Sequence, residues 1–388
     1  MVNQNPYTNK KIEFHILQSF PVTCLNRDDV GAPKTAMIGG VSRARVSSQC
    51  WKRAVRLAMH EVSGVELGVR TKQLAKLIAE ACKDIGATQE QADACGEKFE
   101  KLIFTKKNAK KENDDAESKN DTLVFFSKTE ISAIAEKFKE LNFDPKKMKN
   151  ESSKDKSEKK DEPKNEFENI LEKKKFAEKN NLDGLDIALF GRMVAQAPTM
   201  NVEAASSFSH AISTHKVVNE VDYFTAVADF PSNVQGSAHI GALEFNAATY
   251  YRYIALDLGQ LYESLGDDQF FPQAISAFIK ALYVAVPSAR QSTQAGACSW
   301  DFAEVLVRKG QGMQLSFETP IPKDNNGGFL SKSKEEMRKT LTKKEKLSGS
   351  LFGLIDKFEF GEDENFSVDK LIEMVISAIG KEPKPVEV

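Results

Sequence analysis

Residues 41–60 read VSRARVSSQCWKRAVRLAMH, and the pattern within this stretch changes from that of a strand to that of a helix. Val41 to Val46 has the spacing of a short strand. Ser47 or Ser48 can then cap a helix with its side-chain oxygen, and we expect this helix to run to about Val62. A strand that leads directly into a capped helix is typical of folds that mix both kinds of element.

The expected helix has two chemically different sides. Apolar residues recur at helical spacing along one side, and polar and basic residues recur along the other. The apolar stripe consists of Trp51, Ala54, Val55, Ala58, Met59 and Val62, and the basic stripe of Gln49, Lys52, Arg53 and Arg56. No acidic residue lies between Thr35 and His60, so the local sequence offers these cations no counter-charge.

The basic stripe falls in the first two turns of the helix, where the helix dipole opposes cations and favours anions. A bound phosphate would offset that cost. The N–H groups of the first turn and the preceding Arg43 and Arg45 favour such a site. The alternative is a solvated amphipathic helix, which is the usual meaning of a charged stripe. Spacing and the absence of acids support the two interpretations about equally.

A buried strand is expected upstream, at Ile12 to Phe20, and a loop with several turn-forming residues then runs to Gly40. This loop adds two cations, Arg27 and Lys34, close in sequence to the basic helix. Binding depends on the local field and not on the net charge of the chain, so these cations are candidates for the same phosphate-binding surface.

Residues from about 66 to 180 have a different composition. Three helical patterns occur there, at Thr71–Lys83, Gln89–Phe104 and Glu130–Lys139. Two further stretches consist almost wholly of Lys, Glu, Asp, Asn and Ser, namely Lys106–Asp121 and Asp144–Asn165. These stretches cannot bury enough apolar surface to order themselves, and their mixed charges cancel. We interpret the region as an inserted helical subdomain and not as a nucleic-acid-binding tail.

Regular patterns return after the insertion. In order, they predict a strand at Leu185–Met193, a helix at about Glu203–Lys216, a β-hairpin formed by Asp222–Asp229 and Ser237–Phe245, a strand at Tyr250–Leu258, and a helix at Phe270–Ala285. With the first strands and helix, this order fits an α+β core of the ferredoxin or RNA-recognition type with large insertions. An amphipathic helix is also expected near the C-terminus, at Ser367–Ile379.

Composition limits the possible classes of protein. The 388 residues leave room for roughly two or three structural units. A net charge of −2 and a pI near 6.3 argue mildly against a nucleic-acid binder, although the charges are unevenly placed. The five cysteines form no C-x-x-C pair, and His210 and His215 are expected on different helix faces, so neither metal nor cofactor is predicted.

Sequence signatures of other classes are absent. The chain contains no G-x-G-x-x-G fingerprint, P-loop, H-E-x-x-H or G-x-S-x-G, so a small-molecule enzyme has little support. No apolar run is long enough to cross a bilayer, and the first six residues lack a signal pattern. We therefore expect a cytoplasmic protein without a membrane partner.

Twelve short segments, in order along the chain, resemble the backbone subunit of type I-E CRISPR Cascade complexes, the CasC family. They are Leu25–Asp29, Lys34, Gly39–Gly40, Arg45–Gln49, Lys52–Arg53, Asp186–Leu189, Gly191–Met193, His210–His215, Asp222–Val227, Gly236–Gly241, Glu244–Phe245 and Tyr251–Tyr253. Each segment alone is weak, but together they are specific. The resemblance spans roughly residues 12–300 without the insertion, and the part after about Asn325 matches poorly.

The resemblance implies a hand-shaped protein. Its RNA-recognition-like palm would comprise residues 1–65, 182–220 and 246–321. The helical fingers would comprise residues 66–181, and the thumb would be the hairpin at residues 221–245. Residues 322–388 would form a C-terminal region of unassigned role.

The resemblance also implies partners. The chain would bind a guide RNA (crRNA) without catalysis and would line up head to tail with neighbouring copies, beside other Cascade subunits. Each thumb would displace one base of the guide. Sequence specificity would come from pairing between the guide and target DNA, and not from the protein.

Individual residues gain roles from the resemblance. The family's guide-RNA contacts match Arg27, Lys34, Ser47, Gln49, Lys52, Arg53 and Arg56. Met193 would lean on a base from the end of a palm strand, and Tyr223 and Phe224 would pack beside the displaced base at the thumb. Without the resemblance these three would be taken as ordinary core residues. Arg290 stands where the family tends to have a lysine and would also contact RNA.

Asp28 and Asp29 support a competing hypothesis. From spacing alone this pair fits a turn best, with a salt-bridge partner or a metal-binding pair as alternatives. Related backbone subunits of type III complexes cut target RNA with a loop aspartate, so the chain could instead be a metal-dependent RNA endonuclease that uses Asp28 or Asp29. The surrounding residues match the type I-E pattern, which implies binding without cleavage.

Overall fold

The computed structural model describes residues 5–104, 123–147, 177–178, 181–194, 198–226 and 239–384. The chain divides into two compact units. We call them the sheet unit (Met1–Gly64, Ser206–Gly259 and Phe271–Val388) and the helical unit (Val65–Ala205 and Gln260–Phe270). Residues 182–205, assigned to the palm from the sequence, thus belong to the helical unit, and residues 322–388 belong to the sheet unit.

The sheet unit is built on one antiparallel sheet with the order β13-β12-β1-β11-β9-β3-β2, and β8 and β10 also pair with β11. Its strands are β1 (Lys10–Thr23), β2 (Thr35–Ile38), β3 (Val41–Val46), β8 (Ser206–Phe208), β9 (Ala211–Ser213), β10 (Glu220–Ala226), β11 (His239–Asp257), β12 (Phe302–Lys309) and β13 (Leu354–Phe360). Its helices are α1 (Ser48–Ser63), α8 (Phe271–Val284), α9 (Gln291–Gln294), α10 (Leu330–Ser348) and α11 (Val368–Ile379). The predicted α+β class is confirmed.

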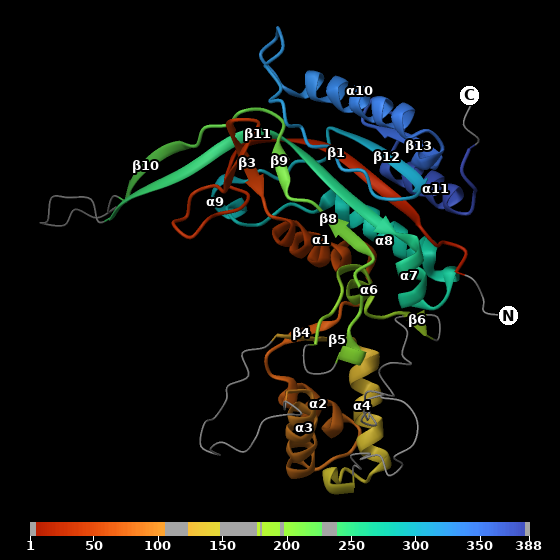
Figure 1. The fold of residues 1–388 in the computed structure, drawn as a ribbon. Coiled ribbons are helices and arrows are strands. Elements are labelled where there is room, and N and C mark those ends of the chain that lie inside the picture. The colour runs from red at the N-terminus through yellow and green to blue at the C-terminus, as the bar shows by residue number, and fades with distance from the viewer. Residues whose placement is uncertain are drawn as a thin grey trace, which may run out of the picture. The chain divides into compact units, whose positions relative to one another are not determined.

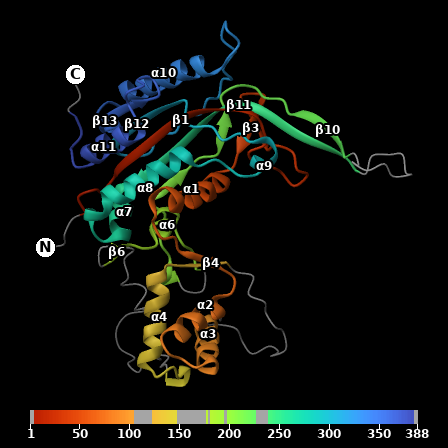
Figure 2. The same ribbon diagram turned by 180° about the vertical axis from the view of Figure 1, so that it is seen from behind.

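The centre of this sheet has the strand order β12-β1-β11-β9. Helix α1 lies in the chain between β1 and β9, and α8 lies between β11 and β12. This is the β-α-β-β-α-β connection of ferredoxin-like folds. Helices α1 and α8 pack together on one face of the sheet, and α10 lies on the other (Figure 1), as the reverse view also shows (Figure 2).

Alternate residues of the central strands face the two sides of the sheet. Phe14 of β1 packs against Phe278 of α8 and against Trp300, whereas Leu17 of the same strand faces α10. The face under α10 is closed by side chains from the segment before this helix and from the helix itself: Leu315, Phe317, Ile321, Met337 and Leu341. In the described residues, this face of the sheet is therefore covered by the chain's own C-terminal part.

A polar network is buried under this cover. Glu13 of β1 forms an ion pair with Arg308 of β12 and also accepts a hydrogen bond from the hydroxyl of Tyr253. The ring of His15 hydrogen-bonds through Nδ1 to the hydroxyl of Tyr251, 2.9 Å away. Burial lowers the pKa of His15 to about 4, so this histidine is neutral at physiological pH.

Two sequence predictions near the start of the second half of the chain are wrong. Leu185–Met193 is not a strand, because Leu185–Phe190 forms the short helix α6, bounded by Gly184 and Gly191 at positive φ. Glu203–Lys216 is not a helix, because it contains β8 and β9, which pair with β11. In both places tertiary pairing and packing override a weak local pattern.

The hairpin and the palm strand after it, which the sequence analysis predicted as separate, share one long strand. β11 runs without a break from His239 to Asp257, pairing first with β10 and then with β1. The end of the expected hairpin, between residues 227 and 238, lies outside the described residues, as do Lys106–Asp121 and most of Asp144–Asn165. No helix in the described residues is long and apolar enough to cross a membrane.

The helical unit contains the three helices predicted in the insertion. They are α2 (Leu74–Asp84), α3 (Gln89–Phe104) and α4 (Lys128–Glu140). The short elements around them are β4 (Val69–Thr71), β5 (Val124–Phe126), η1 (Pro145–Lys147), β6 (Ala177–Glu178), β7 (Asn181–Leu182), α6 and η2 (Pro198–Met200). Ile78, Phe99, Phe126 and Phe138 lie at the centre of one apolar core. Helix α7 (Leu258–Leu265) and η3 (Asp268–Phe270) follow β11 in the chain.

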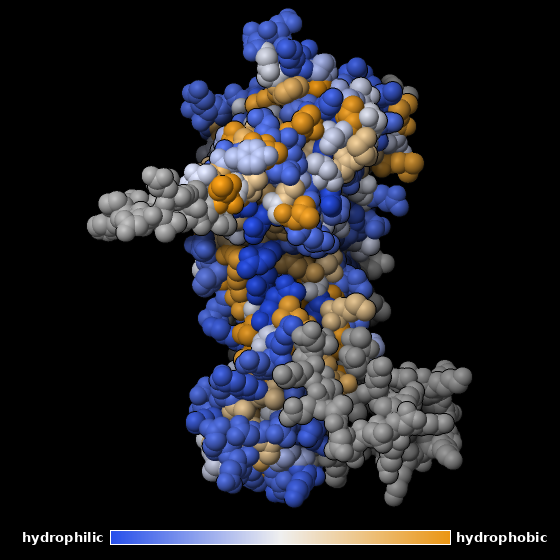
Figure 3. All heavy atoms as spheres, turned by 90° about the vertical axis from the view of Figure 1, so that its left-hand side faces the viewer, coloured by the Kyte–Doolittle hydropathy of each residue, from blue (hydrophilic) through white to orange (hydrophobic). Residues whose placement is uncertain are grey.

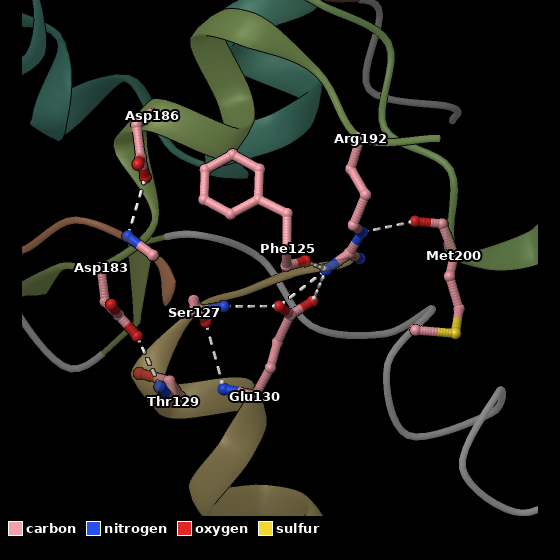
Figure 4. Close-up of polar contacts among 9 residues, drawn as sticks. Phe125, Ser127, Thr129, Glu130, Asp183, Asp186, Arg192 and Met200 are labelled. Atoms are coloured by element: carbon pink, nitrogen blue, oxygen red, sulfur yellow. Dashed lines mark hydrogen bonds and ion pairs between the residues drawn. The ribbon is translucent and has the colours of Figure 1, made fainter. Parts of the chain in front are cut away.

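A buried ion pair links the segment after α6 to the start of α4 (Figure 4). Arg192 Nη1 lies 2.8 Å from Glu130 Oε2, and both side chains are almost fully buried. Glu130 also accepts a hydrogen bond from the Ser127 N–H, and Ser127 Oγ accepts one from the Glu130 N–H, which forms a capping box. Arg192 donates further bonds to the carbonyls of Phe125 and Met200.

Candidate nucleic-acid interface

The N-terminus of α1 is capped as the sequence predicted. Ser47 adopts an extended backbone and its hydroxyl accepts a hydrogen bond from the Cys50 N–H at 3.3 Å. The Ser47 N–H in turn donates to Asn26 Oδ1 at 2.9 Å, which ties the preceding loop to the helix. Trp51, Val55, Ala58 and Met59 are buried along one side of α1, as expected from their spacing.

The expectation that first-turn N–H groups are free for phosphate is only partly met. The N–H of Ser48 donates to Nδ1 of His210 at 3.2 Å, and that of Cys50 is taken by Ser47. Two N–H groups at this helix end therefore already have partners within the chain. The side chains around these N–H groups would therefore make most of the contacts with a bound anion.

Arg43 does not contribute to an anion site, contrary to its sequence-based interpretation. Its guanidinium is fully buried and donates to the carbonyl oxygens of Ser213, Phe317 and Glu318. It joins β3 to the segment that covers the sheet. This role could not be foreseen from the sequence, because the acceptors lie far away in the chain.

The cations around the N-terminus of α1 are mutual neighbours. Burial lowers the pKa of His210, and the charges of Arg45 and Lys34 lower it further. Burial raises the pKa of the Cys50 thiol, whereas Lys34 and Arg53 lower it. Such electrostatic coupling requires proximity, so the fold brings loop, strand and helix cations together.

The predicted RNA contacts on α1 differ in exposure. Gln49 and Arg53 are exposed, whereas Lys52 and Arg56 are half-buried. Nζ of Lys52 lies 5.8 Å from the centre of the Phe208 ring, and burial lowers the pKa of this lysine. Arg53 is therefore the most accessible cation of the helix.

We define the α1 basic surface as Arg27, Lys34, Arg45, Lys52, Arg53 and Arg56. Among the described residues, no carboxylate lies within 4 Å of the charged groups of Arg27, Lys34, Lys52 or Arg53. Elsewhere in the sheet unit about half of the described basic residues have such a partner, for example Lys11 with Asp257. A group of cations in which these four have no carboxylate partner among the described residues is suited to binding a polyanion.

The loop before β2 is an Asx-type turn, as spacing alone favoured. Oδ1 of Asp28 accepts hydrogen bonds from the N–H groups of Val30 and Ala32, at 3.0 and 2.9 Å. Arg27, next to it, is exposed and pairs through its backbone with Pro33.

Arg290 lies near the same loop. It heads the short helix α9, and its charge and that of Arg27 both lower the pKa of Cys24, which burial raises. Two arginines distant in sequence thus adjoin one loop. The predicted contact of Arg290 with RNA stays a prediction.

The two hairpin aromatics face opposite ways. Tyr223 stands opposite Ala242, and Phe224 opposite Gly241. Successive residues of a strand point to opposite faces, so Tyr223 and Phe224 cannot both contact one side of one base. Phe224 lies over Gly241, where an added Cβ would be 2.4 Å from its ring, whereas Tyr223 is 76% exposed.

Met193 belongs to the helical unit, in the segment after α6, and not to the end of a palm strand. Its side chain is 82% exposed, so it is not the core residue that its apolar character would suggest. Apolar residues on the face seen in Figure 3 are exposed in small groups among polar ones.

The sequence did not predict that Asn26 and His210 accept hydrogen bonds from the backbone at the N-terminus of α1. These contacts join segments that are distant in the chain, so only the fold reveals them.

The strand order of the sheet and the positions of α1 and α8 in the chain define an α+β protein of the ferredoxin type, and α1 carries a basic surface. The chain belongs to the CT1975-like protein family, whose profile matches residues 12–360.

Two solved structures resemble the chain over almost its whole length. One, titled "CRISPR RNA-guided surveillance complex, pre-nicking", has a TM-score of 0.76 and 28% identity, covering 95% of this chain and 100% of that one. Another, titled "CRISPR RNA-guided surveillance complex", has a TM-score of 0.66 and 23% identity, covering 95% and 99%, and supports the fold alone. No curated protein sequence matches. The resemblance to Cascade backbone subunits is confirmed.

Proposed function

We propose that this chain is a non-catalytic, guide-RNA-binding backbone subunit of a type I-E CRISPR surveillance complex. Family membership and the similarity to a CRISPR RNA-guided surveillance complex over 95% of the chain support a role in such a complex. The observation that carries RNA binding is the α1 basic surface, where Arg27, Lys34 and Arg53 have no carboxylate partner among the described residues.

Phosphates and sugars of the guide would lie against the α1 basic surface. Contacts of this kind fix the position of a strand without reading its sequence. In many RNA-binding sheets of this type, bases stack on the open sheet face. Here the sheet face opposite α1 is covered by α10 and the segment before it. The bases would therefore remain available to pair with target DNA.

The hairpin of β10 and β11 would interrupt the guide. Tyr223 presents an exposed ring on one face, and Phe224 is held over Gly241 on the other. A two-faced hairpin can separate consecutive bases, because each side offers an apolar surface to a different neighbour. Met193, exposed on the helical unit, would support a base of the guide, and neighbouring copies and other subunits would complete the groove.

Deletion of residues 222–244, with a short turn in their place, tests this arrangement. The sheet unit should still fold, because its palm strands pair independently of the hairpin. Chemical probing of the bound guide should reveal regularly spaced, displaced bases with the wild-type chain and none with the deletion. The same regular pattern in both complexes would refute the thumb role of the hairpin.

The endonuclease alternative is less well supported. Asp28 holds its own turn through two hydrogen bonds, so its Oδ1 is already used. Asp29 is exposed beside it, and the described residues contain no cluster of three potential metal ligands from His, Cys, Asp and Glu. Mg²⁺-dependent cutting of complementary RNA that disappears in Asp29→Ala would favour this alternative over a scaffold without activity.

A further inference from the structure

Arg252 is a buried arginine directly beneath the helix that carries the basic surface. It lies on β11, it is only 2% exposed, and its guanidinium carbon lies 3.6 Å from the centre of the Trp51 ring. Trp51 is on the buried side of α1, immediately before Lys52 and Arg53. The guanidinium is thus stacked on the inner side of this helix, opposite its basic side.

The hydrogen bonds of Arg252 leave part of the group unsatisfied. Its Nη1 donates to Gln18 Oε1 at 2.6 Å, and Gln18 Nε2 donates to the carbonyl of Cys298, which fixes the orientation of the amide. Arg252 Nε and Nη2 and Trp51 Nε1 have no hydrogen-bond partner among the described residues.

Arg252 also lacks a counter-charge. The buried Arg308 and Arg192 are each paired with a glutamate, Glu13 and Glu130 respectively. Among the described residues, no carboxylate lies within 4 Å of Arg252. Burial lowers its pKa to about 9, and the group remains charged at neutral pH.

A buried charge without a counter-ion is costly to a fold, and the stack on Trp51 and the hydrogen bond to Gln18 offset part of that cost. No carboxylate within 4 Å neutralises this charge among the described residues, so it adds to the positive field at α1. An RNA phosphate on the outer side of α1 would lie about 10–15 Å away, because the stacking distance to Trp51 adds to the diameter of a helix with its side chains. The path between them runs through protein, where salt screens charges less than it does in water.

We propose that Arg252 is an internal positioning and electrostatic residue for RNA binding: without touching the guide, it strengthens the binding of phosphate at the α1 basic surface. This inference rests on the proposed guide-RNA binding and adds a residue to it. Two unit charges about 12 Å apart at an effective dielectric constant of about 20 attract strongly enough to change affinity roughly tenfold.

The test compares the full-length chain with four variants in binding to a single-stranded RNA oligonucleotide at several salt concentrations. Arg252→Met and Arg252→Gln remove the charge, the first keeping the volume and the second a donor to Gln18. Arg252→Lys keeps the charge but not the planar stack on Trp51. Arg53→Ala serves as the comparison for a direct phosphate contact.

Both neutral variants should bind RNA about tenfold more weakly than the wild type, with an unchanged slope of log affinity against log salt, because no phosphate contact is lost. Arg252→Lys should stay within about threefold of the wild type. Arg53→Ala should lower the slope by about 0.7. Arg252→Met should remain folded, because methionine nearly keeps the buried volume, and thermal unfolding of each variant checks this.

Several outcomes would overturn the role of Arg252. One such outcome is wild-type RNA affinity in both neutral variants. Another is a loss of RNA affinity in Arg252→Lys equal to that in Arg252→Met. Failure of both neutral variants to fold would assign Arg252 to stability alone. If instead the wild-type chain bound RNA without a salt slope, or Arg53→Ala left that slope unchanged, the proposed function itself would fail.

Discussion

Replacing Arg27, Lys34 and Arg53 together by glutamine is expected to weaken the binding of single-stranded RNA roughly a hundredfold near 0.1 M salt. Each phosphate contact on a single strand contributes about 0.7 to the slope of log affinity against log salt. Three lost contacts therefore lower the slope by about 2, which at about 0.1 M salt corresponds to about a factor of 100. The loss should be similar for RNAs of different sequence, since phosphate contacts carry no sequence information.

A matched control removes the same charge from another place. Lys339, Lys343 and Lys346 are exposed on α10, which covers the opposite face of the sheet from α1. Their replacement by glutamine should leave the RNA salt slope within about 0.3 of the wild-type value, because no phosphate of the guide contacts them. Equal losses in the two triple variants would mean that net charge, and not the α1 basic surface, governs binding.

Glu130→Ala is expected to destabilise the helical unit by about 3–5 kcal/mol. The substitution leaves Arg192 charged and buried without its partner, and it also removes one half of the capping box at the start of α4. Hydrogen exchange of the amides in α2, α3 and α4 measures this loss directly. Tryptophan fluorescence would miss it, because Trp51 and Trp300 both belong to the sheet unit.

Glu140→Ala is the control on the same helix. Glu140 pairs with Lys137 at 3.0 Å, but its side chain is 67% exposed, and such surface pairs contribute little. The loss of protection should stay below about 0.5 kcal/mol. A comparable loss in both variants would show that the buried ion pair contributes no more to the stability of the helical unit than the exposed pair.

The sequence was informative where structure is decided locally. The strand Val41–Val46 and the capped helix after it were predicted nearly to the residue, because cap, apolar stripe and strand spacing all lie within that stretch. The turn at Asp28 was foreseen for the same reason, since its side chain bonds to backbone groups two and four residues away.

The sequence was misleading where distant segments decide. Leu185–Phe190 is too short to separate a helical from an alternating pattern, and its burial on nearly all sides hides the period. The strands β8 and β9 exist because β11 and β3 offer them partners. Arg43 looks like Arg45 in the sequence, yet only the fold places the carbonyls of Ser213 and Phe317 around it.

In the candidate site too, features determined by local sequence could be predicted, and features determined by distant segments could not. The cations of the α1 basic surface could be named from their spacing, although physics alone did not separate a phosphate site from a solvated face. Arg252 could not be found this way, because it is far from α1 in the chain and reaches Trp51 only across the sheet unit. The orientation of the two hairpin aromatics was not foreseen, since strand pairing turns Tyr223 and Phe224 to opposite faces.

The central claim is that this chain binds a guide RNA through the sugar-phosphate backbone of the RNA. The most direct measurement is to purify the chain with its natural partners, extract the bound nucleic acid and determine its kind and length. We expect RNA of one defined length, released by high salt and retained at low salt. Recovery of no nucleic acid, or of DNA or RNA of random length, would contradict the account.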